Sequence, residues 1–230
     1  MPTIQFKSSN FDRKPSWKNA ELNSLGDALH DSIDPVKFQI GDQAIYIHSR
    51  VYLDDGKAFL YWVCLDIESK ENHSSISANI KAAQDLLLLL DDHGLTEGLV
   101  ILLSGSGFRF VWPWVVPLEW KGAFSSWIQT VACIDWGLNL GNKFIRMAGY
   151  RGNANQGKPT KDVHIEALNN IHDIWFLTEV DYQFMVEGKP PEPEDMTWLP
   201  SVLPGPIYLP ANWQTFLQDF KTRAELAASL

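Results

Sequence analysis

Two acidic residues, Asp66 and Glu68, stand one position apart at the end of an apolar run. Side chains alternate between the two faces of a β-strand, so both carboxylates would share one face. Carboxylates at the end of a buried strand are costly unless something positive meets them. Mg²⁺ is bound by one or two carboxylates together with water and phosphate oxygens. The pair therefore suggests a divalent metal site; the alternative is a strand end that enters a solvated loop.

A glycine-rich turn follows further along the chain, as Ser104-Gly105-Ser106-Gly107, with Arg109 two residues later. The turn lies between two apparent strands, which excludes a phosphate-binding loop of the kind that precedes a helix. Its glycines would let phosphate or sugar approach the backbone closely, and Arg109 would hold a triphosphate in a bidentate manner. The alternative is a simple hairpin turn with an exposed arginine.

A third acidic residue, Asp135, follows the apolar Ala132-Cys-Ile segment. An aspartate in this position suits a third metal ligand. It equally suits a residue that caps a helix end. The residue alone does not decide between these two interpretations.

A basic segment runs from residue 136 to residue 161 and contains no Asp or Glu. A short strand would present Arg146, and a loop rich in Gly and Asn would follow it. Such an arrangement suits contacts to phosphate and sugar, although a solvated basic loop has the same composition. The cations of the segment are Lys143, Arg146, Arg151, Lys158 and Lys161.

The elements that must position these residues are predicted from periodicity and turn signals. Helices are expected at 19–32, 77–93, 123–133 and 213–226, the last capped by Asn212. Strands are expected at 44–53 and 57–67, joined as a hairpin, and at 99–104, 108–115 and 143–147. The Pro-rich stretch 190–210 is expected to be mostly loop. We therefore predict one domain over 1–188 and a linker with a C-terminal helix over 189–230.

Composition narrows the function classes. The 230 residues are 45% hydrophobic and 20% charged, which is typical of a globular protein. The formal charge is −9, and removing the five cations of the basic segment leaves −14 on the remainder. This excludes wholesale wrapping of DNA and leaves one local basic track.

No run of apolar residues is long enough to span a membrane, and the N-terminus lacks the apolar region of a signal peptide. With two cysteines in apolar surroundings, Cys64 and Cys133, a cytoplasmic protein is expected.

The order of these motifs resembles the archaeo-eukaryotic primase superfamily, most closely the primase-polymerase branch of plasmids, phages and other mobile elements. The resemblance covers residues 45 to 161, about half of the chain. Asp66 and Glu68 match the first motif, the 104–109 turn the second and Asp135 the third. Arg109 stands where the family's second motif ends in His. The basic strand and loop approximate a pattern of Arg, Gly, Asn and Lys at Arg146, Gly149, Asn155 and Lys158.

The resemblance implies an α+β fold: an N-terminal α/β module and a modified RNA-recognition-like module, with an antiparallel sheet flanked by helices. It implies metal-dependent, template-directed nucleotidyl transfer on single-stranded DNA, with nucleoside triphosphates as substrates. Asp66, Glu68 and Asp135 would hold Mg²⁺ or Mn²⁺, and the ions would activate a hydroxyl for attack on the α-phosphate. A helicase or replication protein would be a separate partner. The implied nucleotide contacts are Ser104, Gly105, Ser106, Gly107, Arg109, Arg146, Asn155 and Lys158. The candidate DNA contacts are Lys143, Tyr150, Arg151 and Lys161.

Two other functions remain open. A catalytically inactive nucleic-acid-binding subunit on the same fold would account for Arg109 and the acidic surface. A metal-dependent nuclease would account for the acidic pair and for Lys70, which forms a Glu-x-Lys pattern with Glu68. The nuclease hypothesis gives no role to the glycine turn or to the basic loop.

Overall fold

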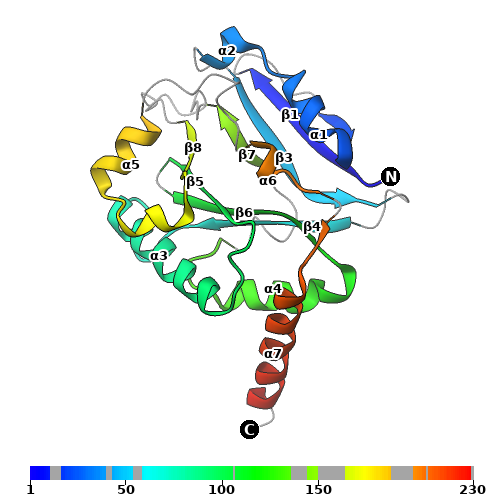
Figure 1. The fold of residues 1–230 in the computed structure, drawn as a ribbon, viewed down its shortest axis with the longest axis vertical. Helices are drawn as coiled ribbons and strands as arrows, with labels where there is room; N and C mark the ends of the chain where they lie inside the picture. Colours follow the sequence, from blue (N-terminus) through cyan, green and yellow to red (C-terminus); the bar gives the residue numbers. More distant parts are fainter. Residues whose placement is uncertain are drawn as a thin grey trace.

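The computed structural model describes residues 1–10, 17–39, 43–53, 59–105, 107–135, 144–149, 164–187, 199–205 and 207–228. Over these residues the protein is an α+β fold, in which helices flank a curled, mostly antiparallel sheet (Figure 1). The predicted fold class is confirmed at this level. No helix in the described ranges has the length and apolar character needed to cross a lipid bilayer.

One half of the sheet is built around β3, which pairs antiparallel with its neighbours. Its strands are β1 (Thr3–Asn10), β2 (Lys18–Glu21), β3 (Gln43–Tyr52) and β7 (Phe144–Gly149), in the order β2-β1-β3-β7. The other half of the sheet is joined to it by the β3–β4 hairpin, where Arg50 faces Tyr61 and Tyr52 faces Phe59. The predicted hairpin is confirmed.

The second half of the sheet carries the acidic strand. It consists of β4 (Phe59–Ile67), β6 (Gly107–Val116), β5 (Val100–Ser104) and β8 (Ile165–Ala167), all antiparallel, with β9 (Ile207–Tyr208) parallel to β6. The chain runs β4-α3-β5-β6-α4 and then returns to β4 at an isolated antiparallel bridge between Ile134 and Ile67. The bridge lies beside β4, on the edge away from β6.

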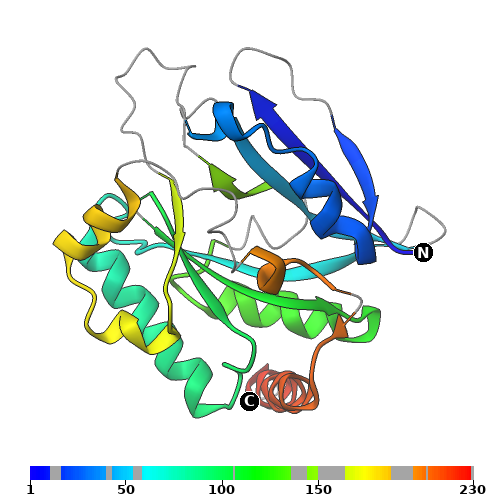
Figure 2. The same cartoon turned by 45° about the horizontal axis from the view of Figure 1, so that its top comes forward.

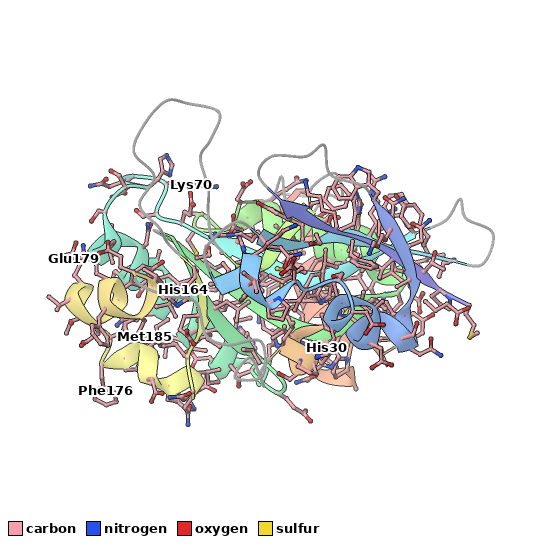
Figure 3. The ribbon with its side chains drawn as sticks, turned by 90° about the horizontal axis from the view of Figure 1, so that it is seen from above. His30, Lys70, His164, Phe176, Glu179 and Met185 are labelled. Atoms are coloured by element: carbon pink, nitrogen blue, oxygen red, sulfur yellow. The ribbon has the colours of Figure 1, made fainter. Side chains whose placement is uncertain are left out.

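Helices cover one face of this second half (Figure 2). They are α3 (Ile76–Asp92), α4 (Lys121–Thr130), α5 (Glu179–Val186) and α7 (Ala211–Ala228). Figure 3 shows Phe176 and Glu179 at the outer edge of the molecule, on the α5 side, with His30 of α1 well apart from them. The first half carries α1 (Leu25–His30) and α2 (Pro35–Gln39), while α6 (Leu199–Val202) packs on β6. Short 3₁₀ turns are η1 (Leu22–Ser24), η2 (Leu118–Trp120) and η4 (Ile171–Trp175).

Strand β4 divides two hydrophobic cores, because its side chains alternate between the two faces of the sheet. Val63 and Leu65 face the core beneath α3 and α4. Trp62 and Cys64 face the core shared with the first half of the sheet. Asp66 lies on the same face of β4 as Trp62 and Cys64, because side chains two positions apart in a strand point the same way. Alternation therefore places its carboxylate between the two halves of the sheet.

Several predicted elements need correction. Residues 19–32 were expected to form one helix, but they contain the end of β2, then η1 and α1. Residues 18–21 pair with β1, and this long-range pairing prevails over the local helical pattern. The helix expected over 123–133 ends at Thr130, because the chain then turns to reach β4. The stretch 190–210 also contains α6 and β9 among its described residues.

The C-terminal helix is tied to the main core. Trp213 and Leu217 are fully buried against residues of α3, α4 and β6, whereas the last two turns of α7 are exposed and project from the body (Figure 1). Replacing a buried Trp by Ala typically costs 3–5 kcal/mol, about the largest loss that a single core residue causes. A division of the chain after residue 188 stays a prediction, but α7 contributes to the same core as the strands.

Candidate active site

The structure brings the acidic strand and the glycine turn together in one cavity of about 240 Å³. Five strands contribute to its wall, from both halves of the sheet. The lining residues are Tyr46, Asp66, Glu68, Ser104, Arg109, Phe144 and Arg146. Asp66 and Glu68 therefore line the same cavity, although Glu68 follows the end of β4 at Ile67.

Arg109 lies directly opposite Asp66 in the β4–β6 register. Its Nε donates to Asp66 Oδ1 at 3.3 Å, and its Nη1 donates to the backbone oxygen of Arg146. The Arg109 and Asp66 side chains are only 13% and 16% exposed. The alternative of a hairpin with an exposed arginine is thus wrong: the hairpin is present, but Arg109 is held inside the cavity.

Arg146 is brought in by β7 and is buried. Its Nη1 donates to the backbone oxygen of Gly149 at 3.2 Å. Gly149 has φ of +82°, and a Cβ there would lie 2.3 Å from the backbone oxygen of Gln43. A side chain at position 149 would therefore push β7 away from β3 and displace Arg146.

The glycine turn is a tight hairpin, in which Ser104 pairs with Gly107. Gly105 adopts φ of +80°, a conformation that strongly favours glycine. A Cβ on Gly107 would lie 2.9 Å from the backbone oxygen of Ile67, so the missing side chain lets the turn approach the end of β4. The buried Tyr182 of α5 donates its hydroxyl to the Gly107 oxygen at 2.7 Å, and burial raises the pKa of this tyrosine. The turn is therefore fixed from both sides.

Asp135 is attached to the same strand through its backbone. Its N–H donates to the Asp66 oxygen at 2.9 Å, and Glu68 N–H donates to the Cys133 oxygen at 3.0 Å. The Asp135 side chain is exposed and is not among the residues lining the cavity. Within the described ranges, no three His, Cys, Asp or Glu side chains are grouped as one metal site.

The donor set of the cavity fits a hard divalent cation. Asp66 and Glu68 supply two carboxylates, and Mg²⁺ commonly takes one or two carboxylates and completes its shell with water and phosphate oxygens. Arg109 and Arg146 lie in the same cavity and present guanidinium groups, which bind phosphate well. Chemically, the arrangement suits a metal-associated polyphosphate.

Several predicted contact residues lie outside the described residues. These are Ser106, Lys143, Tyr150, Arg151, Asn155, Lys158 and Lys161. Trp112 and Trp114 of β6 are buried core residues and do not line the cavity. Tyr46 and Phe144 line the cavity but were not predicted, because only the pairing of β3 with β7 places them there.

Comparison with known proteins gives no relative for this chain. No family model, no curated protein and no solved structure matches it.

Proposed function

We propose that this chain is the catalytic domain of a DNA primase-polymerase of the archaeo-eukaryotic primase superfamily. The observation that carries the proposal is the convergence of Asp66, Glu68 and Arg109 on one cavity, which Ser104, at the start of the glycine turn, also lines. The β4-α3-β5-β6-α4 connectivity, with the return to β4 at Ile134, supports the modified RNA-recognition-like module expected for that superfamily.

In the proposed reaction a hydroxyl of a primer or an initiating nucleotide attacks the α-phosphate of a nucleoside triphosphate, and pyrophosphate leaves. Asp66 and Glu68 would hold Mg²⁺ or Mn²⁺, and the cation would neutralise charge on the phosphates; Asp135, predicted as a third ligand, does not line the cavity. Arg109 and Arg146 bind the phosphate oxygens and orient them. The glycine turn lets the triphosphate approach the backbone at Gly105.

The test is nucleotide incorporation on a primed single-stranded template with Mn²⁺. The Asp66→Ala, Glu68→Ala double variant is expected to lose the activity of the wild type. The matched control is Asp92→Ala, Glu97→Ala, which also removes two negative charges but from exposed positions, and it should retain activity. A second variant, Asp66→Asn with Glu68→Gln, keeps the side-chain shapes and should be equally inactive. Activity in both site variants would overturn the assignment.

A non-catalytic nucleic-acid-binding subunit is the second candidate, and one observation favours it. Arg109 replaces the family's His and forms an ion pair with Asp66, so the guanidinium competes with a metal for that carboxylate. Binding of a nucleotide or DNA by a wild type that incorporates nothing would establish this function instead.

A metal-dependent nuclease has weaker support. Lys70, the basic residue of the Glu-x-Lys pattern, is exposed in the loop after β4 and does not line the cavity with Glu68 (Figure 3). The nuclease hypothesis predicts metal-dependent loss of full-length labelled DNA without added nucleotides.

A further inference from the structure

A row of cationic and aromatic side chains crosses the first half of the sheet. Lys7 of β1 faces Tyr46 of β3, and Tyr46 faces Arg146 of β7. The residues that alternate with them, including Phe6 and Ile145, are buried in the core. Alternation therefore places the row on the opposite face of the sheet.

Three aromatic rings gather around the Lys7 ammonium. Its Nζ lies 4.5 Å from the ring centroid of Trp17, 4.6 Å from that of Tyr46 and 5.5 Å from that of Phe144. Trp17 and Phe144 are stacked, with centroids 3.4 Å apart and an interplanar angle of 19°. We call Trp17, Tyr46 and Phe144 the aromatic platform.

The aromatic platform is continuous with the candidate active site. Tyr46 and Phe144 line the same cavity as Asp66. Trp17 remains 44% exposed, although a tryptophan gains much from full burial. Desolvation lowers the pKa of Lys7, as expected for an ammonium set against rings. An exposed ring and a cation that contact two cavity-lining aromatic residues are the elements of a single-strand binding surface.

We propose that the aromatic platform stacks bases of a single-stranded DNA template and that Lys7 contacts the adjacent phosphate, leading the strand to the cavity. The inference rests on the proposed function, since it takes DNA as the ligand. Stacking is independent of base identity, which suits a template of any sequence. With a formal charge of −9 the chain gains little from general electrostatic attraction, so stacking must supply much of the affinity.

The experiment measures binding of fluorescein-labelled oligodeoxythymidine of about 20 nucleotides by anisotropy, beside an abasic strand of equal length. Trp17→Ala should weaken thymidine binding roughly 5- to 150-fold, the range for one lost stacking contact, and leave abasic binding unchanged. The matched control is Trp175→Ala: Trp175 is similarly exposed, at 41%, but lies on η4 and is not among the residues that line the cavity.

Two further variants sharpen the test. Trp17→Phe keeps a stacking ring and should retain most of the affinity, which separates stacking from misfolding. Lys7→Gln should weaken both probes and reduce the slope of log affinity against log salt by about 0.7. Equal losses for the thymidine and abasic strands in Trp17→Ala, or no loss for either, would overturn the stacking proposal.

The two proposals fail in different ways. Nucleotide incorporation by the wild type, with normal thymidine binding by Trp17→Ala, would refute the stacking role of the aromatic platform and support the proposed enzyme activity. Selective loss of thymidine binding in Trp17→Ala, with no nucleotide incorporation by the wild type, would refute the proposed enzyme activity and support the stacking role of the aromatic platform. A wild type that binds neither strand would refute the platform outright.

Discussion

Replacing Arg109 by Gln is expected to destabilise the protein and to increase its response to Mn²⁺. The guanidinium Nε lies 3.3 Å from Asp66 Oδ1, and both side chains are mostly buried. Arg109 also donates to the Arg146 backbone. The substitution removes the ion pair and the second hydrogen bond, while Asp66 and Glu68 stay in the cavity.

The size of the effect follows from the separation and the burial. At 3.3 Å and an effective dielectric constant of about 20, the Coulomb attraction is about 5 kcal/mol before desolvation is subtracted. Exposed pairs contribute about 0–1 kcal/mol, and removing one partner of a fully buried pair costs about 3–5 kcal/mol. Because the Arg109 and Asp66 side chains are 13% and 16% exposed, we expect Arg109→Gln to lower the free energy of unfolding by about 2 kcal/mol. At this chain length the Tm falls by about 4–8 °C.

Mn²⁺ is expected to stabilise the Arg109→Gln variant more than it stabilises the wild type. Without Arg109 the two carboxylates repel one another, and a divalent cation gains Asp66 without displacing a guanidinium. If Mn²⁺ binds the variant tenfold more tightly, saturating Mn²⁺ stabilises the variant by about 1.4 kcal/mol more than the wild type. Urea unfolding with a chelator and with Mn²⁺ measures both effects. Arg223→Gln, on the exposed part of α7, is the control and should change stability by less than about 0.5 kcal/mol.

A double-mutant cycle decides whether the ion pair is the cause. Asp66→Asn removes the other partner of the ion pair. The double variant, with both Arg109→Gln and Asp66→Asn, should therefore lose less unfolding free energy than the sum of the losses in the two single variants. Additive losses, or equal stabilisation of wild type and Arg109→Gln by Mn²⁺, would refute the reasoning.

Two further predictions concern the surroundings of the cavity. Tyr182→Phe should cost about 1–3 kcal/mol in urea unfolding, because the Gly107 oxygen loses its buried donor, whereas Tyr208→Phe, at an exposed position, should be neutral. Burial raises the pKa of the Cys64 thiol from its ordinary value of 9.0 to about 12. The thiol therefore ionises in the unfolded chain before it ionises in the folded protein. As a result, the free energy of unfolding falls as the pH rises above 9.0. Between pH 8 and pH 10 this contributes a loss of about 1.4 kcal/mol, which should be missing in Cys64→Ala.

Much of the second half of the sheet could be predicted from the sequence. Strands β4, β5 and β6 combine β-branched and aromatic residues with clear turn signals, and α3 has a sustained helical period ending near Gly94. Alternation alone placed Asp66 and Glu68 on one face. It did not show that Arg109 faces Asp66, because that contact depends on the register between β4 and β6, which are more than 40 residues apart.

The first half of the sheet was harder to predict for the same reason. Strand β1 was not predicted, and its pairing with β3 joins residues more than 30 positions apart, which no local pattern shows. The position of β7 beside β3, which brings Arg146 and Phe144 to the cavity, is also a long-range contact. Helix α5 was missed although a signal was present: Thr178 and Asp181 form a capping box at its start.

The charge balance of the cavity explains how an acidic chain would accept a polyanion under the proposed function. Asp66 and Glu68 formally cancel Arg109 and Arg146, so the cavity does not attract a triphosphate by net charge. A divalent cation carried with the triphosphate would be held by Asp66 and Glu68 and would neutralise their charge, which would leave the Arg109 guanidinium available for phosphate oxygens. Under the proposed function, Arg109 would exchange its contact with Asp66 for a contact with phosphate oxygens once the metal-bound triphosphate is in place. A shorter His at position 109 would reach the phosphate less readily across the same strand pair. The proposed reaction therefore requires the metal to displace the Arg109 guanidinium from Asp66, which the Mn²⁺ response of Arg109→Gln measures.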